Sequence, residues 1–308
     1  MRHKVSVIGA GNVGATCAQY ILENKLADVV LVDKVEGLPQ GKALDMMAAG
    51  PSRGFDADIK GSNDYADTAD SDIVVITAGL ARQPGMSRED LLAKNVAIVK
   101  SVTEDVSKRS PKSIIIVVTN PLDVMSYLAW KISGFKSNKV IGMAGVLDSA
   151  RFRCFLAKEL KVSAGDIQAM VLGGHGDSMV PLARFCTVAG VPVTELLSKE
   201  KLDKIIERTK NAGAEVVAHL KTGSAYYSPA ASVVEMVECI LKDKKRLLPA
   251  SAYLNGEYGL KDLYIGVPVI LGASGVEKVL ELPLTAEEKK LLGDSASVVS
   301  SNIKSLNL

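Results

Sequence analysis

The chain has 308 residues, enough for about two domains that each bury a core of their own. Its 37 lysines and arginines nearly balance its 35 aspartates and glutamates, which argues against a nucleic-acid binder and a polybasic membrane binder. No apolar run in the sequence approaches the ~20 residues that a membrane span needs.

The cysteines and the first residues bear on the cellular compartment. Cys17, Cys154, Cys186 and Cys239 lie far apart without a C-x-x-C pair, so we expect four buried, reduced thiols, no zinc site and a cytoplasmic protein. The start, MRHK before an apolar stretch, has the outline of a secretory signal, but glycines and an asparagine within residues 9–14 interrupt that stretch.

In the first half of the chain, short apolar runs alternate with longer helical patterns. The runs predict strands near residues 4–9, 28–33, 72–79 and 113–121, and the patterns predict helices near residues 13–26, 38–49 and 91–108. Nearly continuous valine and isoleucine is typical of strands that are buried on both faces of a parallel sheet. The first half therefore predicts an α/β fold with a doubly wound (Rossmann) parallel sheet.

In the second half of the chain, the regular alternation of strands and helices gives way to a mixed pattern. It predicts an amphipathic helix at residues 148–163, short strands near 169–174 and 184–190, and an antiparallel hairpin at 265–282 that turns between Gly272 and Gly275. A last helix opens with a capping box of Thr285 and Glu288. Because no flexible linker separates the halves, we expect a doubly wound domain over residues 1–145 packed closely on a mixed α+β domain over residues 146–308.

The first motif with chemical content is G-x-G-x-x-G at residues 9–14, directly after an expected strand and at the start of an expected helix. In that setting Gly9 permits a tight turn, Gly11 lets the backbone approach a pyrophosphate, and Gly14 lets helix and strand pack closely. Asp33, which ends the next strand, can accept hydrogen bonds from ribose hydroxyls and repel a 2′-phosphate. NAD is therefore expected, although the neighbouring Lys34 weakens discrimination against NADP.

The second motif centres on His175 in the segment GGHGDS. Flanking glycines favour an exposed, sharply turned backbone, and an imidazole is suited to proton exchange near neutral pH. Asp148 and Arg151 lie three residues apart at the start of a helix and so share a face. Asp148 could hold the histidine while Arg151 presents its guanidinium to a carboxylate. A structural histidine and a surface ion pair are the simpler alternatives.

A third group follows the strand at residues 72–79. Arg82 and Arg88 lie on a loop bounded by glycine and proline, which suits a lid that closes over an anion, the alternative being a solvated basic loop. Asn120 ends another parallel strand, and Asn95 is a weaker candidate on the intervening helix.

Together the segments GAGNVG, ARQPGMSR, VTNP, GVLDSARFR, GGHGDSM and GSAYYSPAAS resemble the lactate/malate dehydrogenase family over essentially the whole chain. The likeness is greatest to the lactate-dehydrogenase-like, NAD-dependent malate dehydrogenases of bacteria and archaea. It implies that His175 accepts the proton of a 2-hydroxy acid, with Asp148 as its carboxylate partner. It also implies that Arg151 binds the C1 carboxylate of the substrate and that Arg88 polarises the carbonyl.

The same resemblance assigns the cofactor contacts, with Asn120 touching both substrate and cofactor. The implied NAD-binding residues are Gly9, Ala10, Gly11, Asn12, Val13, Gly14, Asp33, Asn95, Val118, Thr119 and Asn120.

Arg82 predicts the substrate. Lactate-type enzymes have a neutral glutamine at the matching position, whereas a second guanidinium matches the second carboxylate of oxaloacetate. Burying that carboxylate unpaired would cost several kcal/mol. We therefore expect reversible, NAD-dependent oxidation of (S)-malate to oxaloacetate, a step of the tricarboxylic acid cycle. A lactate or relaxed 2-hydroxy-acid dehydrogenase, and a non-catalytic NAD-binding protein, remain alternatives.

Association is the least determined property. The helical segment at residues 37–50 has more small and apolar residues than one core face needs, so it could pack on a second subunit. The family resemblance implies dimers or tetramers, and we expect a homotetramer. Apart from the dicarboxylate substrate and further copies of the chain, no nucleic acid, membrane or metal partner is expected.

Overall fold

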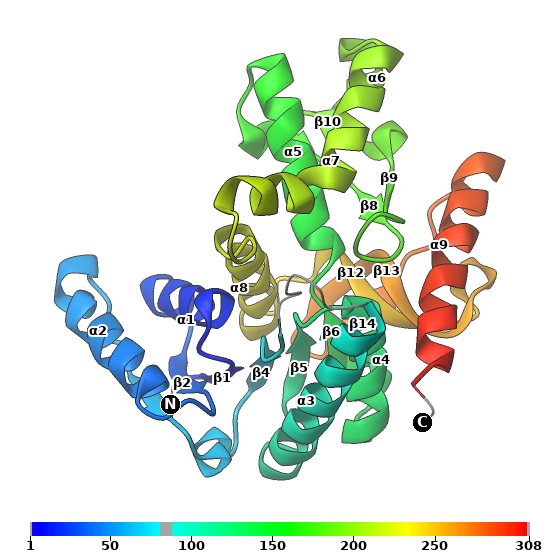
Figure 1. Ribbon diagram of the computed structural model, residues 1–308. Coiled ribbons are helices and arrows are strands. Elements are labelled where there is room, and N and C mark those ends of the chain that lie inside the picture. Colours follow the sequence, from blue (N-terminus) through cyan, green and yellow to red (C-terminus); the bar gives the residue numbers. More distant parts are fainter. Residues whose placement is uncertain (1, 81–87, 307–308) are drawn as a thin grey trace.

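One nine-stranded sheet runs through the molecule, in the order β14-β13-β12-β6-β5-β4-β1-β2-β3 (Figure 1). The structure is a computed structural model that describes residues 2–80 and 88–306, without the side chain of Arg88. The parallel strands are β1 (Lys4–Ile8), β2 (Asp28–Val32), β3 (Ile59–Ser62), β4 (Ile73–Ile76), β5 (Ile114–Val117) and β6 (Val140–Gly142). The antiparallel strands are β12 (Arg246–Asn255), β13 (Lys261–Gly272) and β14 (Gly275–Val279).

The parallel strands have the spatial order 3-2-1-4-5-6, which is that of a doubly wound sheet. The predicted fold class is therefore confirmed. Between β1 and β4 the chain connections run off in opposite directions, and ligands of such sheets bind in the crevice beyond the strand ends at this switch point. The segment at residues 9–14 follows β1 and therefore lies at that crevice.

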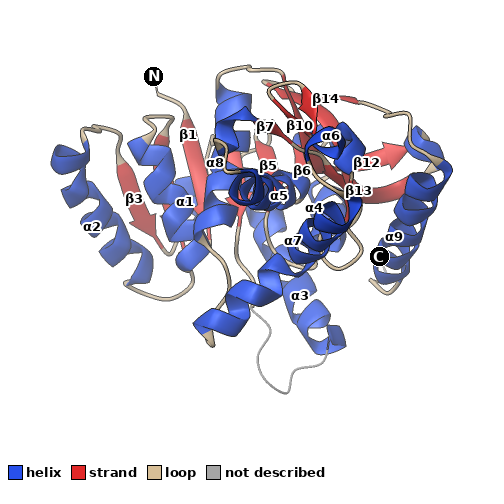
Figure 2. Cartoon of the chain, turned by 90° about the horizontal axis from the view of Figure 1, so that it is seen from above, coloured by secondary structure: helices blue, strands red, loops and turns tan. Residues whose placement is uncertain are grey.

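Helices cover both faces of the sheet (Figure 2). On one face α1 (Asn12–Glu23) packs against α8 (Tyr227–Leu241), and on the other α3 (Arg88–Arg109) packs against α4 (Leu122–Ser133). Successive strand residues point to opposite cores: Ile114 and Ile116 join the α1 and α8 side, whereas Ile115 and Val117 join the α3 and α4 side. This alternation explains why the strands are apolar at nearly every position.

Several elements differ from the expected boundaries. Helix α1 ends at Glu23 rather than at residue 26, and α2 (Leu38–Arg53) continues through Pro51 to a left-handed Gly54. Strands β3 and β6 and helix α4 were not expected. Strand β6 has only three residues, and β3 has one large apolar residue, so neither presents a hydrophobic period long enough to recognise.

The part of the second half that contains α5, α6 and α7 forms a smaller layer above the carboxyl ends of the parallel strands (Figure 1). Besides α8, the helices of the second half are α5 (Gly145–Leu160), α6 (Val193–Leu196), α7 (Lys199–Leu220) and α9 (Ala286–Lys304). Its short strands are β7 (Ile167–Gln168), β8 (Val171–Leu172), β9 (Val180–Pro181), β10 (Thr187–Val188) and β11 (Val191–Pro192). In the two halves together, short 3₁₀ turns occupy Tyr65–Thr68, Ser137–Lys139, Ala164–Asp166, Ala183–Phe185 and Glu257–Gly259. The capping box of Thr285 and Glu288 is present at the start of α9.

The expected hairpin is formed by β13 and β14, which pair Gly272 with Gly275. Strand β12 was not expected, because Pro249 interrupts its sequence, and in the sheet this proline faces Pro268 of β13. Strand β12 also pairs with β6 through Ser251 and Gly142. The sheet therefore continues from the first half of the chain into the second.

The cysteines require one correction. Cys17, Cys186 and Cys239 are buried and unpaired, but Cys154 is exposed. It lies on α5 two residues after the buried Phe152, and residues two apart on a helix point to different faces. Among the described residues, every helix is too short or too polar to cross a membrane.

Candidate active site

The glycine loop, residues 9–14, joins β1 to α1. Gly9 has φ of +107°, a conformation open to glycine, and its amide donates to the carbonyl of Val32 at the end of β2 (2.7 Å). Helix α1 begins at Asn12, and no described side chain caps its first turn or places an acid there. The amides of that turn and the helix dipole therefore favour an anion.

The three glycines of this loop differ in what surrounds them. A Cβ on Gly9 would lie 2.7 Å from the Thr77 hydroxyl oxygen, and one on Gly14 would collide with the carbonyl of Gly9. A Cβ on Gly11 would meet no described atom within 4 Å. Gly9 and Gly14 are thus required by packing, whereas Gly11 leaves backbone open to a ligand. This arrangement fits the pyrophosphate of NAD.

The peptide of Ala10 is held from both sides. Its N–H donates to Oδ2 of Asp33 (2.7 Å), and its carbonyl accepts from Nζ of Lys42 on α2 (2.7 Å). Oδ1 of Asp33 accepts from the amide of Val35 (3.0 Å). Asp33 therefore shapes the glycine loop, and its carboxylate keeps lone pairs for a ribose.

Asn95 connects the ends of two central strands. Its Oδ1 accepts from the amide of Leu80 (2.8 Å), and its Nδ2 donates to the carbonyl of Asn120 (2.7 Å). The Thr119 hydroxyl donates to the carbonyl of Ala78 (2.6 Å). Asn95 and Thr119 are buried, Val118 is half-buried and Asn120 is exposed. Asn95 thus uses its amide to hold the backbone beside Asn120.

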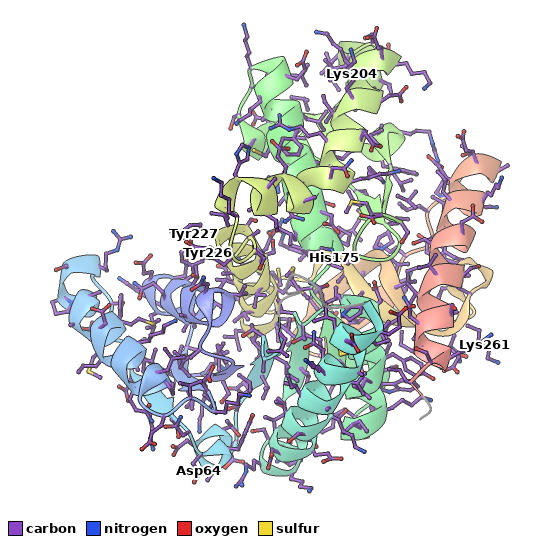
Figure 3. The ribbon with its side chains drawn as sticks, viewed as in Figure 1. Asp64, His175, Lys204, Tyr226, Tyr227 and Lys261 are labelled. Atoms are coloured by element: carbon purple, nitrogen blue, oxygen red, sulfur yellow. The ribbon has the colours of Figure 1, made fainter. Side chains whose placement is uncertain are left out.

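His175 lies on the histidine loop, residues 173–178, between β8 and β9. Figure 3 labels it near the centre of the molecule, close to the end of α5 that faces the sheet. Its Nδ1 is 2.8 Å from Oδ2 of Asp148, a residue in the first turn of α5. Asp148 is 2% exposed and the His175 side chain is 14% exposed. Because the carboxylate of Asp148 accepts a hydrogen bond from Nδ1–H, Nε2 is left as the proton acceptor of the neutral ring.

The surroundings of His175 favour its protonated form. Burial disfavours the imidazolium, but the charge and hydrogen bond of Asp148 and the charge of Asp123 outweigh it, and Arg151 opposes them weakly. The net effect raises the pKa of His175 above its ordinary value.

Arg151 lies one turn along α5 from Asp148, with 3.6 Å between its Nη1 and Oδ1 of the carboxylate. That oxygen has no hydrogen-bond partner among the described residues. Burial lowers the pKa of Arg151, and Asp148 opposes the shift, but a guanidinium stays charged in proteins. Its side chain is 14% exposed, so Arg151 is a half-enclosed cation whose fork remains available for a carboxylate.

Arg82 lies outside the described residues. Arg88 begins α3, but its side chain is also outside them. The roles expected for these two arginines remain predictions from the sequence.

The structure also brings Asp123, Ser251 and Lys42 to the site, and the sequence did not indicate any of them. Asp123, in the first turn of α4, accepts from the backbone amide of His175 (2.9 Å) and from the Ser251 hydroxyl (2.7 Å). Lys42 contacts the glycine loop. An acidic residue in a first helical turn is explained by the helix dipole alone, and a lysine on an amphipathic helix by solvent. Neither pattern indicates burial against a distant loop.

Two family models match the chain. The NAD-binding domain of lactate/malate dehydrogenase matches residues 3–142, and the α/β C-terminal domain matches residues 145–307. A malate dehydrogenase of Roseiflexus sp. (strain RS-1) is 59% identical over 306 residues, covering 99% of each chain.

Solved structures of malate and lactate dehydrogenases are also similar to this chain. The malate dehydrogenase of Salinibacter ruber has a TM-score of 0.95 at 56% identity, covering 99% of this chain and 97% of its own. The lactate dehydrogenase of Cryptosporidium parvum, solved with lactic acid and nicotinamide adenine dinucleotide, has a TM-score of 0.96 at 47% identity, covering 100% and 98%. The glycine loop lies at the switch point of the sheet, and His175 is paired with Asp148 in the second half of the chain. With these features and both family models matched, this chain belongs to the lactate/malate dehydrogenase family.

Proposed function

We propose that this chain is an NAD-dependent malate dehydrogenase, which reversibly oxidises (S)-malate to oxaloacetate. The observation that best supports oxidation of a 2-hydroxy acid is the cluster of His175, Asp148 and Arg151, which combines a proton acceptor with a cation suited to a carboxylate in one half-enclosed place, whereas the choice of malate rests on Arg82 and on the relatives. The curated relatives at 59–61% identity are malate dehydrogenases.

In the oxidation direction, neutral His175 takes the proton of the C2 hydroxyl at Nε2. Asp148 fixes the tautomer through Nδ1 and stabilises the imidazolium that forms. When bound, NAD supplies the acceptor for the C2 hydride. Arg151 holds the C1 carboxylate through its planar fork, which orients C2.

The remaining contacts complete the site. Gly9, Ala10, Gly11, Asn12, Val13, Gly14 and Asp33 hold the adenosine and pyrophosphate end, and Asn95, Val118, Thr119 and Asn120 line the nicotinamide end. Arg88 polarises the reacting oxygen, and Arg82 pairs with the second carboxylate of the substrate. We divide the chain between residues 145 and 146 into cofactor and substrate domains, because all six parallel strands precede that point.

The alternative that the chain is a lactate dehydrogenase can be tested directly. Lactate dehydrogenases occur among the structural neighbours at sequence identities similar to those of some malate dehydrogenases. Consumption of NADH and NADPH should be measured with oxaloacetate and with pyruvate. We expect oxaloacetate and NADH to be preferred. Arg82→Gln should lower kcat/KM for oxaloacetate on the order of 10²- to 10³-fold, because a buried carboxylate loses its partner, while the KM for NADH stays within about twofold.

Preferred use of pyruvate by the unmodified chain would overturn the choice of malate. Consumption of neither substrate would favour a non-catalytic NAD-binding protein.

The chain is also proposed to be a cytoplasmic homotetramer that serves the tricarboxylic acid cycle. Four unpaired cysteines fit a reducing compartment. On α2, Leu44 is 67% exposed and Met47 is 47% exposed, which favours burial of this helix in a subunit contact. The mass in solution from light scattering would separate tetramer from dimer and monomer.

A further inference from the structure

The histidine loop is fixed through three consecutive backbone amides, and each is bound by a different element. Gly173 donates to the carbonyl of Gly266 on β13 (2.9 Å), Gly174 to the hydroxyl of Ser295 on α9 (2.8 Å), and His175 to the carboxylate of Asp123 on α4 (2.9 Å). The first two acceptors are neutral. Only the third is an acid, and it holds the residue that bears the imidazole.

The side chain of Asp123 is buried. It is 4% exposed, and its second oxygen accepts from the Ser251 hydroxyl (2.7 Å), which is fully buried on β12. A carboxylate removed from water costs several kcal/mol unless it is hydrogen-bonded. A neutral acceptor such as a carbonyl or hydroxyl would anchor the amide of His175 without that cost, as Gly266 and Ser295 do for the neighbouring amides. A buried acid at this place therefore requires a reason besides anchoring.

The reason follows from the charges that face His175. Asp148 and Arg151 face His175 from α5, with 3.6 Å between Oδ1 of Asp148 and Nη1 of Arg151. Asp123 faces it from α4, where its carboxylate accepts from the His175 amide. Arg151 partly offsets Asp148, so the imidazolium next to this pair sees less than a full negative charge. Asp123, which lies on a separate element, adds the negative charge that Arg151 offsets.

We propose that Asp123 is a positioning residue for His175, which fixes the backbone of the histidine loop and places a second negative charge near the imidazole. The proposal rests on the proposed function, in which His175 exchanges the substrate proton. Asp123 acts through His175 and does not touch the substrate.

Two further observations agree with this role. The charge of Asp123 contributes to raising the pKa of His175, after burial and Asp148. Burial and the charge of Asp148 raise the pKa of Asp123, and the hydrogen bonds from Ser251 and from the His175 amide and the charge of His175 offset only part of this upward shift. Both hydrogen bonds are donated to the acid, which suits its ionised form.

Asp123→Asn separates charge from anchoring. The asparagine oxygen can still accept from the His175 amide, and its NH₂ group can donate to Ser251. Without the charge, the imidazolium is less stable and the pKa of His175 falls. Malate oxidation needs the neutral ring, so its acid limb should move to lower pH, by about 0.5 to 1 unit. The falling limb of oxaloacetate reduction should move in the same direction.

Ser295→Ala is the matched control, because it removes a neutral anchor from the adjacent amide and leaves every charge in place. We expect it to lower kcat by a few-fold without moving either limb. The limbs come from kcat/KM against pH, and the pKa of His175 itself comes from an NMR titration of the free protein. The chain has three histidines, so His175→Asn identifies the signal.

A folded Asp123→Asn variant with unmoved limbs and an unmoved NMR titration would overturn the proposal, and so would equal shifts in Asp123→Asn and Ser295→Ala. If Asp123→Asn fails to fold, Ser251→Ala takes its place, because losing that hydroxyl destabilises the carboxylate. Its limb should move in the same direction by a smaller amount, and an unmoved limb counts against the proposal. Absence of any dehydrogenase activity in the unmodified chain would instead reject the proposed function, and the NMR titration would still test Asp123.

Discussion

The two ends of the site are built in opposite ways. At the cofactor end, six consecutive residues form the glycine loop, and Asp33 binds Ala10 from only 23 positions away. At the proton-transfer end, His175 meets Asp148 from 27 positions away and Asp123 from 52, and Asp123 meets Ser251 across 128. The first end consists mainly of backbone, whereas the second consists of buried charges from several elements.

This difference predicts how each end responds to substitution. Backbone amides stay in place when a neighbouring side chain changes, so variants at the cofactor end should alter NAD affinity in small steps. Buried charges depend on one another, so variants at the proton-transfer end should alter kcat strongly.

The largest effect is expected for Asp148→Asn. Asparagine has nearly the shape of aspartate, but its NH₂ group would face Nδ1 and impose the wrong tautomer on His175. We expect kcat to fall on the order of 10³- to 10⁴-fold, with the KM for NAD almost unchanged. Steady-state kinetics in both directions check this, and a loss below about tenfold would contradict the role of Asp148.

Arg151→Lys should have a smaller effect. Lysine keeps the positive charge but loses the planar fork, so one of two carboxylate hydrogen bonds is lost. We expect the KM for malate to rise about 10- to 100-fold. The acid limb of the pH profile should stay within a few tenths of a unit, since the local charge is retained. A KM equal to that of the unmodified chain would show that the C1 carboxylate binds elsewhere.

The smallest effect is expected at the cofactor end, for Lys42→Met. Methionine keeps the apolar stem of lysine but cannot donate to the carbonyl of Ala10. The loss of one hydrogen bond of about 1 kcal/mol should raise the KM for NAD about fivefold and leave kcat and both pH limbs unchanged.

Lys34→Met provides the control for Lys42→Met. It removes the same charge from the exposed neighbour of Asp33, and it should leave the KM for NAD unchanged while reducing any use of NADP. If Lys42→Met lowered kcat by more than about tenfold, the separation between the two ends of the site would be wrong.

The same contrast explains what the sequence could predict. The doubly wound sheet was predictable because each of its long strands is apolar on both faces, as Ile114 to Val117 illustrate. Strands β3 and β6 were not, because their pairing is set by the neighbouring strands rather than by their own residues. Strand β12 was not recognised because a proline within an apolar run argues against a strand, and Pro249 lies in the middle of β12, opposite Pro268 of β13.

At the site, the glycine loop and Asp33 were predictable because motif and spacing lie within one β-α-β unit. The pairing of His175 with Asp148 was one of two interpretations of these residues until the family resemblance favoured it, since nothing in their spacing brings them together. Asp123 and Lys42 could not be identified, because their residue types suit an exposed helix equally well. Burial by distant elements gives them their contacts, and a single sequence does not encode that burial locally.

The pairing of β6 with β12 has a consequence for dissecting the molecule. The sheet crosses from one half of the chain to the other through Gly142 and Ser251, and Asp123 on the near side binds the same serine. A fragment cut after β6 would expose a bare strand edge and leave a buried acid without its hydroxyl partner. Such a fragment is expected to self-associate rather than to persist as an independent nucleotide-binding module.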